Sequence, residues 1–340
     1  MHPRAAIKAI ASFLPAGTLT NEELAEQFGN WHASQILSKT GIAVRHVAAA
    51  DECASDLGVA AAQRLFESGA CAPEGVDFLL FCTQSPDYFL PSSACVMQHR
   101  LGLKTTCGAL DFNQGCSGYV YGLAMAKSLV ETATSTNVLL ITADTYTRFI
   151  NPRDRSVRTL FGDGAAATLV QAVKADSEFI GPFVLGTDGR GADRLIVPSG
   201  GLRCPPTAST AVEKQDSSGN WRSEQDLYMD GADVFSFALK TVPPVLEELL
   251  RKCALTLDQV DMVILHQANK FMLERLRDKM KIPHEKFWIE MEETGNTVSS
   301  TIPIALESAR KQGRVKPGDR VALVGFGVGY SWGAAMIEIA

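Results

Sequence analysis

The segments VDFLLFCTQS (residues 76–85) and VDMVILHQAN (residues 260–269) decide the fold, because they are two copies of one pattern. Each begins with Val-Asp, continues as an apolar run typical of a buried strand and ends in polar residues. A second pair, NVLLITAD and DRVALVGF, has Val138 and Val321 at matching positions. The first pair is offset by 184 residues and the second by 183. The chain is therefore predicted to be a duplication, with one βαβ-type unit in each half.

Short β-rich segments alternate with helical patterns between these runs, which favours an α/β architecture. Thr20 and Glu23 have the spacing of a capping box and Gly29 is a stop signal, so a helix is predicted between them. Residues 198–226 are rich in Gly, Pro, Ser and Thr and are predicted to form a surface loop or flap. We expect two similar layered halves, residues 1–175 and 176–340, with the active site where corresponding strand ends meet.

The composition is that of a globular protein: 340 residues, 46% hydrophobic and 21% charged. A net charge of −6 argues against broad binding of nucleic acid or anionic membranes.

The opening residues are interpreted as a strand, because Lys8 and Pro15 interrupt any signal-like apolar core. No apolar run approaches the ~18 residues of a membrane span, so we expect a cytoplasmic protein. The eight cysteines form no CxxC pair and no zinc-type cluster, which predicts reduced thiols and no metal.

Cys116 is a candidate nucleophile in the segment LDFNQGCSGYVYG, residues 110–122. The apolar run before it is typical of a strand and the small residues after it of a helix, so the thiol is expected at a strand-to-helix turn. The positive end of the helix would lower the thiol pKa, and Gly115 and Gly118 would allow a strained turn and close approach of a substrate. Local context leaves a packed cysteine equally open.

His266 directly follows the apolar run that ends at Leu265, at the strand end where ligands gather in α/β sheets. By the repeat it corresponds to Cys82. Asn296 lies in a Gly-Asn turn signal near Ser299, the second-half counterpart of Cys116. A lone histidine or a turn asparagine is commonly structural, and both interpretations remain open at this point.

The segment GFGVGYSWGAA near the C-terminus has alternating glycines at 325, 327 and 329. Their missing side chains leave backbone amides free to meet an oxyanion. The segment has no GxGxxG spacing, so a dinucleotide site is not predicted.

NQGCSG, HQAN, GNTVSSTIP and GFGVGYSWGAA together resemble the β-ketoacyl-acyl-carrier-protein synthase III family of the thiolase superfamily. The similarity runs through nearly the whole chain, including LPSSAC, DRSVRTLFGDGAA and VKPGDRVALVGF. The resemblance implies a duplicated thiolase-like αβαβα five-layer fold, a homodimer and a Cys-His-Asn active site.

By this resemblance, Cys116 takes an acyl group from acyl-CoA. His266 and Asn296 then hold the thioester carbonyl of malonyl-acyl-carrier protein while it loses carbon dioxide. The resulting carbanion attacks the acyl-Cys carbonyl, whose oxyanion meets the backbone amides of Cys116 and Val328. The product is a 3-oxoacyl-carrier protein, and no cofactor is implied beyond these substrates.

Substrate contacts follow the family pattern less closely. The position of the usual adenine-stacking tryptophan holds Gln35, with Trp31 four residues earlier, whereas Arg155 matches the usual arginine partner. Leu90 and the flap are candidates for setting the width of the acyl channel. The cations Lys270, Arg275 and Arg277 are candidates for contacting an acidic carrier protein, with Phe271 where a basic residue is common.

Alternatives within the superfamily remain. A degradative or biosynthetic thiolase would need a second C-terminal cysteine, and this chain has none after Cys253. An elongating synthase would have a second histidine at the position of Asn296. A related acyltransferase or thioester hydrolase, a ketosynthase of a specialised pathway, and a non-catalytic partner subunit are the other hypotheses.

Overall fold

A computed structural model describes residues 3–29 and 31–340. Its first sheet has the strand order β1-β7-β6-β4-β5, in which β4 runs parallel to β5 and β6. β7 is antiparallel to both β6 and β1. The strands are β1 (Arg4–Phe13), β4 (Phe78–Cys82), β5 (Gly108–Phe112), β6 (Asn137–Asp144) and β7 (Gly164–Val173). The predicted first strand is confirmed by β1.

The second sheet repeats the first. Its order is β8-β16-β15-β13-β14, with β13 parallel to β14 and β15, and with β16 antiparallel to β15 and β8. The strands are β8 (Ile180–Thr187), β13 (Met262–Leu265), β14 (Phe287–Trp288), β15 (Arg320–Gly327) and β16 (Ser331–Glu338). The predicted duplication is confirmed, because strands at matching positions pair in the same order and direction. The proposed boundary after residue 175 falls between β7 and β8.

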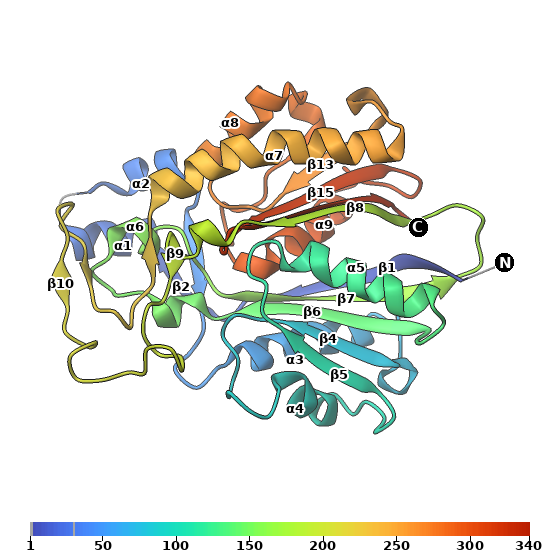
Figure 1. Cartoon of the computed structure of the whole chain (residues 1–340), viewed down its shortest axis with the longest axis horizontal. Coiled ribbons are helices and arrows are strands. Elements are labelled where there is room, and N and C mark those ends of the chain that lie inside the picture. The colour runs from blue at the N-terminus through green and yellow to red at the C-terminus, as the bar shows by residue number, and fades with distance from the viewer. Residues whose placement is uncertain (1–2, 30) are drawn as a thin grey trace.

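Helices form the other three of five layers (Figure 1). α5 and α9 lie between the two sheets, α3 and α4 cover the first sheet, and α7 and α8 cover the second. The bounds are α3 (Ala54–Glu67), α4 (Ser93–Arg100), α5 (Gly118–Glu131), α7 (Gly231–Cys253), α8 (Lys270–Met280) and α9 (Thr301–Lys311). Val120 and Leu123 of α5 and Ile302 and Leu306 of α9 are fully buried in one apolar cluster between the sheets. The predicted αβαβα architecture is confirmed.

Smaller elements gather at one end of the layers, at the left of Figure 1. They include α1 (Asn21–Phe28), α2 (Ala33–Thr40), α6 (Arg155–Arg158), β2 (Gly17–Thr20), β3 (Val44–Val47), β9 (Leu195–Ile196), β10 (Lys214–Gln215), β11 (Trp221–Arg222) and β12 (Tyr228–Met229). The capping box predicted at Thr20 and Glu23 is present at the start of α1, and Gly29 ends that helix at a φ of 68°. The predicted flap carries the hairpin β10-β11 and is mostly exposed.

Six 3-10 turns complete the described elements: Pro73–Gly75, Tyr146–Phe149, Gly189–Gly191, Leu257–Gln259, His284–Lys286 and Val298–Ser300. Across residues 3–29 and 31–340, no helix has both the length and the apolar character needed to cross a membrane. Within the same residues, no group of three or more His, Cys, Asp or Glu side chains has an arrangement that could hold a metal ion.

Candidate active site

Cys116 lies at the corner between β5 and α5, as predicted, and only 4% of it is exposed. Neither Gly115 nor Gly118 has a positive φ, so their role here is to allow close packing and not an unusual backbone conformation. A Cβ on Gly115 would lie 2.4 Å from Val328 and 2.5 Å from the Oε1 atom of Gln84. A Cβ on Gly118 would lie 2.3 Å from the sulfur of Cys82. The corner is therefore tight because protein atoms surround it, and the expected backbone strain is absent.

Burial raises the pKa of the Cys116 thiol to about 12. The backbone N–H groups of Val328 and Cys116 interact with the thiol and act in the opposite direction, but desolvation is the larger cause. The expectation that the start of α5 lowers this pKa was wrong, because a helix terminus offsets only part of the cost of charging a fully buried sulfur. The closed site thus holds a neutral thiol, which would need a base before it could act as the predicted nucleophile.

His266 directly follows β13, and its backbone N–H donates to the carbonyl of Val324 in β15. The ring is 2% exposed, and burial lowers its pKa to about 3, so the imidazole is neutral at physiological pH. Nδ1 lies 2.7 Å from the hydroxyl oxygen of Thr301, which also lies 3.1 Å from the carbonyl of Val298. A neutral imidazole can therefore present to the cavity the base or the donor form of Nε2.

The one hydroxyl proton of Thr301 decides between these two forms. If it goes to the carbonyl of Val298, Nδ1 of His266 carries the ring proton and Nε2 is a base. If it goes to Nδ1, the ring proton is on Nε2, which is then a donor. The residue that holds the histidine thus accommodates both of its tautomers.

Backbone hydrogen bonds to the first half fix the position of Asn296. Its N–H donates to the carbonyl of Leu160 and its carbonyl accepts from the N–H of Gly162. The side-chain Oδ1 accepts from the N–H of Val298 at 3.0 Å, while Nδ2 lies 3.4 Å from the carbonyl of Ala268. An amide group carries two hydrogens on Nδ2, so a second N–H remains for a ligand in the cavity.

Cys116, His266 and Asn296 line one cavity of about 440 Å³, together with Gly327 and Phe326. Most of the other lining is apolar, and a dry wall strengthens the electrostatic interactions inside. A Cβ on Gly327 would lie 2.7 Å from the sulfur of Cys116, so the glycine provides the space for the thiol. The predicted nucleophile, histidine and asparagine therefore meet, with the predicted amides of Cys116 and Val328 at the sulfur.

Comparisons with known proteins agree with this geometry. The family models for 3-oxoacyl-[acyl-carrier-protein] synthase III and for its C-terminal part match residues 110–189 and 250–339. A beta-ketoacyl-[acyl-carrier-protein] synthase III of Caldanaerobacter subterraneus subsp. tengcongensis is 37% identical over 334 residues, 98% of this chain and 97% of that protein. The chain belongs to the 3-oxoacyl-acyl-carrier-protein synthase III family. It is an acyltransferase with the thiolase fold.

Solved structures of synthases place the enzyme in the same group. A crystal structure of a 3-oxoacyl-(acyl-carrier-protein) synthase III matches with a TM-score of 0.98 and 54% identity, over 99% of this chain and 100% of that one. The 3-oxoacyl-(acyl-carrier protein) synthase of Burkholderia xenovorans LB400 matches at 0.90 and 33%, over 100% and 95%. The priming β-ketosynthase from the R1128 polyketide biosynthetic pathway matches at 0.87 and 29%, over 99% and 97%.

Trp31 and Arg155 lie together at the mouth of the enzyme's cavity. The guanidinium of Arg155 is 5.6 Å from the Trp31 ring centre, and the ammonium of Lys39 is 5.2 Å from it. The displacement of the tryptophan by four residues in sequence therefore does not remove an aromatic ring from this mouth. Leu90, by contrast, is 83% exposed and lines a second, larger cavity that does not include Cys116.

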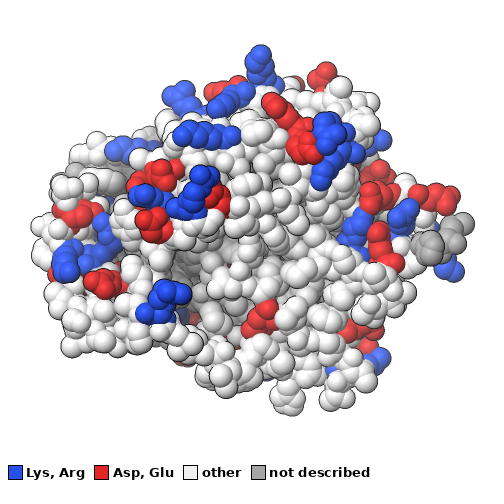
Figure 2. Space-filling model, in the orientation of Figure 1, with Lys and Arg blue, Asp and Glu red and all other residues white. Residues whose placement is uncertain are grey.

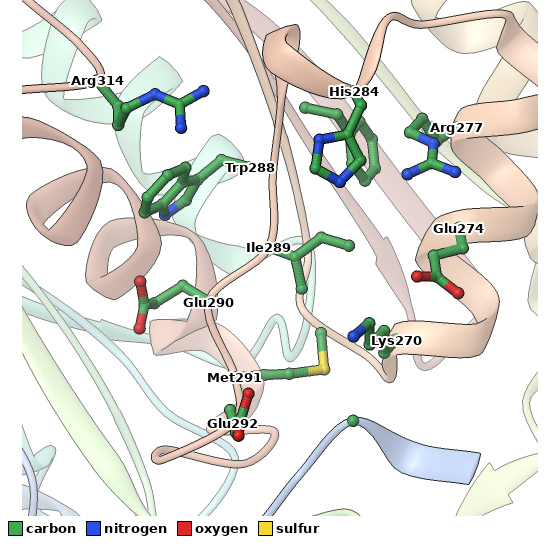
Figure 3. Close-up of a pocket in the computed structure, with 12 residues that line it drawn as sticks. Lys270, Glu274, Arg277, His284, Trp288, Ile289, Glu290, Met291, Glu292 and Arg314 are labelled. Atoms are coloured by element: carbon green, nitrogen blue, oxygen red, sulfur yellow. The ribbon is translucent and has the colours of Figure 1, made fainter. Parts of the chain in front are cut away.

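The three predicted carrier-protein cations of the synthase do not form one patch. Lys270 and Arg277 line a cleft of about 350 Å³ together with Glu274 of the same helix (Figure 3). Arg275 instead lies over Phe271, with its guanidinium carbon 5.2 Å from the ring centre. Phe271 lines the cavity that holds Cys116, so Arg275 packs on a side chain of that cavity's wall.

Three features of this site in the synthase were missed by sequence reasoning. Thr301, Asp144 and the contact between Tyr146 and Gln84 were not singled out. Thr301 and Asp144 were accessible through the repeat, because they correspond to Gly118 and Gly327 at offsets of 183 residues. The contact of Tyr146 with Gln84 joins residues 62 positions apart and has no pattern in the sequence.

Proposed function

We propose that the enzyme joins an acyl group from acyl-CoA to malonyl-acyl-carrier protein by decarboxylative Claisen condensation. The observation that carries the proposal is the convergence of Cys116, His266 and Asn296 on one cavity, with two backbone N–H groups at the thiol. A nucleophile, a neutral imidazole and an amide donor are the groups that acyl transfer followed by enolate formation requires.

In the acylation step, Nε2 of His266 accepts the proton of the Cys116 thiol while the sulfur attacks the thioester carbonyl. The oxyanion that forms is stabilised by the N–H groups of Cys116 and Val328. CoA leaves as a thiol after taking the proton from Nε2, and acyl-Cys116 remains. The raised pKa of Cys116 makes this base necessary, because the buried thiol has little thiolate at neutral pH.

In the condensation step, the bond between the malonyl carboxylate and the α-carbon breaks, and carbon dioxide leaves. The electron pair becomes an enolate, whose oxygen accepts from Nε2–H of His266 and from Nδ2 of Asn296. The α-carbon then attacks the acyl carbonyl, and the Cys116 sulfur leaves as a thiolate that takes one proton from solvent, the proton that the loss of carbon dioxide consumes. His266 needs its donor form here and its base form during acylation, and the hydroxyl of Thr301 supports both.

Recognition of the two substrates is proposed at two groups of residues around the cavity. The ring of Trp31 beside the Arg155 guanidinium offers a stacking surface for the adenine of CoA. Arg275, with Lys270 and Arg277 on the same helix, offers positive charge to an acidic carrier protein.

We also propose a cytoplasmic homodimer. β5 is an edge strand of the first sheet, and Leu110 on it is 46% exposed. Phe89 and Leu90 in a nearby loop are 82% and 83% exposed. Charged side chains are sparse on the part of the visible face over β5 and α4 (Figure 2). An open edge with exposed apolar side chains favours pairing with a second copy. The eight free cysteines support a reducing compartment.

A ketosynthase of a specialised pathway is the second candidate. The similarity to the R1128 priming β-ketosynthase and the aromatic Phe271 at the position of a common basic residue favour it. The chemistry at Cys116 is the same in both candidates. They differ in the primer and in the carrier protein that is used.

Intact-mass measurement after incubation with a series of acyl-CoA thioesters tests the proposal. The enzyme is expected to gain the mass of one acyl group, which peptide mapping assigns to Cys116. Addition of malonyl-acyl-carrier protein should then release carbon dioxide, remove the added mass and yield 3-oxoacyl-carrier protein. Acyl transfer without carbon dioxide release would favour the acyltransferase alternative. The absence of any added mass from every thioester would favour a non-catalytic partner subunit.

A further inference from the structure

Two cavities meet near Cys116. The thiol lines the cavity of about 440 Å³ described above, and a larger one of about 1350 Å³ lies beside it. Leu195 lines both cavities, and Val328, whose backbone N–H interacts with the thiol, lines the larger one. Only a thin partition therefore separates the sulfur from the larger cavity.

Tyr146 and Gln84 form the polar part of this partition. The hydroxyl of Tyr146 donates to Oε1 of Gln84 at 2.5 Å, and both residues line the larger cavity. Tyr146 is 4% exposed and belongs to the same apolar cluster as Cys116. The Oε1 atom of Gln84 packs against Gly115, the residue before Cys116, at 2.5 Å from the position of a Cβ there. The hydrogen bond thus lies next to the nucleophile.

Further contacts fix the positions of both Gln84 and Tyr146. The backbone N–H of Gln84 donates to Asp144, and its side-chain Nε2 donates to Asn113, each at 2.8 Å. The ring of Tyr146 packs against Phe149 and Phe161, with ring centres 6.0 and 5.2 Å apart. The glutamine is anchored by polar contacts and the tyrosine by apolar ones, so the hydroxyl is the single polar link between them.

We propose that Tyr146 and Gln84 are a hydrogen-bonded gate that limits the acyl group on Cys116 to short aliphatic chains. The proposal rests on the proposed acylation of Cys116. A short acyl chain stays on the thiol side of the gate. A longer chain must displace the Tyr146 ring and enter the larger cavity, whose nearest wall contains Phe149, Leu195 and Leu227. These apolar side chains suit an alkyl tail and offer nothing to a charged one.

Displacement of the ring breaks the hydrogen bond and leaves a buried hydroxyl without its acceptor. The loss of one such bond changes a rate or an equilibrium by about tenfold. Removing the hydroxyl removes this cost, while a phenylalanine ring keeps the apolar packing. Tyr146→Phe should therefore favour long primers specifically, without a general loss of activity.

The experiment measures the rate of enzyme acylation by acetyl-CoA and by octanoyl-CoA, followed by intact mass. We expect the ratio of octanoyl to acetyl rates to rise about tenfold in both Tyr146→Phe and Gln84→Met, because each removes one end of the bond. The double variant should rise no further than either single one, which is the sign of one shared interaction. Tyr121→Phe is the matched control, because its hydroxyl donates to the carbonyl of Gly186, and Tyr121 lines neither cavity.

Unchanged ratios in Tyr146→Phe and Gln84→Met would overturn the gate, as would equal loss of both rates or effects that simply add in the double variant. An increased ratio in Tyr121→Phe would also overturn it, since the effect would then be general. Failure of the proposed function is a different result: the unsubstituted enzyme would take no acyl group from either thioester.

Discussion

The corner that holds Cys116 and the corner that holds Ser299 are related by the duplication, but only one of them carries the proposed nucleophile. Both lie where a strand-helix turn of one half meets a strand end of the other half. The offset from Cys116 to Ser299 is 183 residues, the same as that between the starts of β6 and β15. The backbone scaffold is thus common to both corners, and the difference between them lies in a few side chains.

The facing strand ends differ most. Cys116 faces Gly327 of β15, and the missing side chain leaves room for the thiol. Ser299 faces Asp144 of β6, which accepts from the serine N–H at 3.2 Å and from its hydroxyl at 2.5 Å. A glycine therefore opens one corner to a ligand, and a buried carboxyl group occupies the other.

The residues beside the two corners differ as well. In the second half, Thr301 at the start of α9 contacts His266 after β13. The corresponding residues of the first half are Gly118 and Cys82. Gly118 has no side chain that could contact Cys82 as the Thr301 hydroxyl contacts His266. One half thus supplies the proposed nucleophile and the other the proposed acid-base group. The duplicated fold needs both halves to make one site.

Cys116→Ser gives the largest expected effect, because it puts the residue of the silent corner into the reactive one. The acylation rate should fall roughly 10⁴-fold, since a buried hydroxyl is a much weaker nucleophile than a thiol. The measurement is time-resolved intact mass with acetyl-CoA, and Cys95→Ser at an exposed cysteine is the control. Condensation by Cys116→Ser at the normal rate would show that Cys116 is not the nucleophile.

Asp144→Asn tests the silent corner through stability. Burial raises the pKa of Asp144 to about 7, so the folded protein retains this proton at pH values where the unfolded chain has lost it. The stabilisation from that proton is complete below about pH 4 and is lost as the pH rises towards 7. An asparagine has no proton to lose. The stability of the unsubstituted protein relative to Asp144→Asn should therefore fall between pH 4 and 8, by at most about 4 kcal/mol.

Thermal unfolding of both proteins across this pH range measures the effect. Asp193→Asn, at an exposed carboxyl group, is the control for the loss of one acidic residue. A difference between the two proteins that is constant with pH, or that grows in favour of Asp144 as the pH rises, contradicts the prediction. The first result would show that Asp144 has the same pKa in the folded and unfolded chain.

Gly327→Ala tests the opening in the reactive corner. Its Cβ would lie 2.7 Å from the sulfur and 2.8 Å from the Cβ of Cys116, closer than these atoms can pack. The nucleophile must shift, and a displacement of this size should lower the acylation rate about 10²-fold. Gly189→Ala is a matched control, because a Cβ there would meet no atom within 4 Å. Normal acylation by Gly327→Ala, with the fold intact by circular dichroism, would mean that the thiol has more space than the structure gives it.

The sequence predicted the duplication and the meeting of Cys116, His266 and Asn296, because strand patterns and their offsets are local features that survive duplication. It gave the wrong direction for the pKa of Cys116, since desolvation depends on everything packed around the sulfur. From the sequence, Gly115 was also expected to allow a strained backbone. In the structure, the close contact with Val328 is the reason why a side chain does not fit at this position. Effects that depend on distant segments meeting in space have no local pattern from which to predict them.

Thr301→Val gives the smallest expected effect and tests the contrast between Thr301 and Gly118. Valine keeps the volume of threonine but removes the hydroxyl, so Nδ1 of His266 loses the partner 2.7 Å away in a buried position. The donor form of the ring then loses the hydroxyl proton that its Nδ1 accepts, and carbon dioxide release from malonyl-acyl-carrier protein by pre-acylated enzyme should fall about tenfold. Thr301→Ser restores a hydroxyl and should recover most of the rate. Equal activity of the valine and serine variants would mean that only the volume of this residue matters, and that the histidine is oriented by its backbone bond to Val324 and its contact with Phe326.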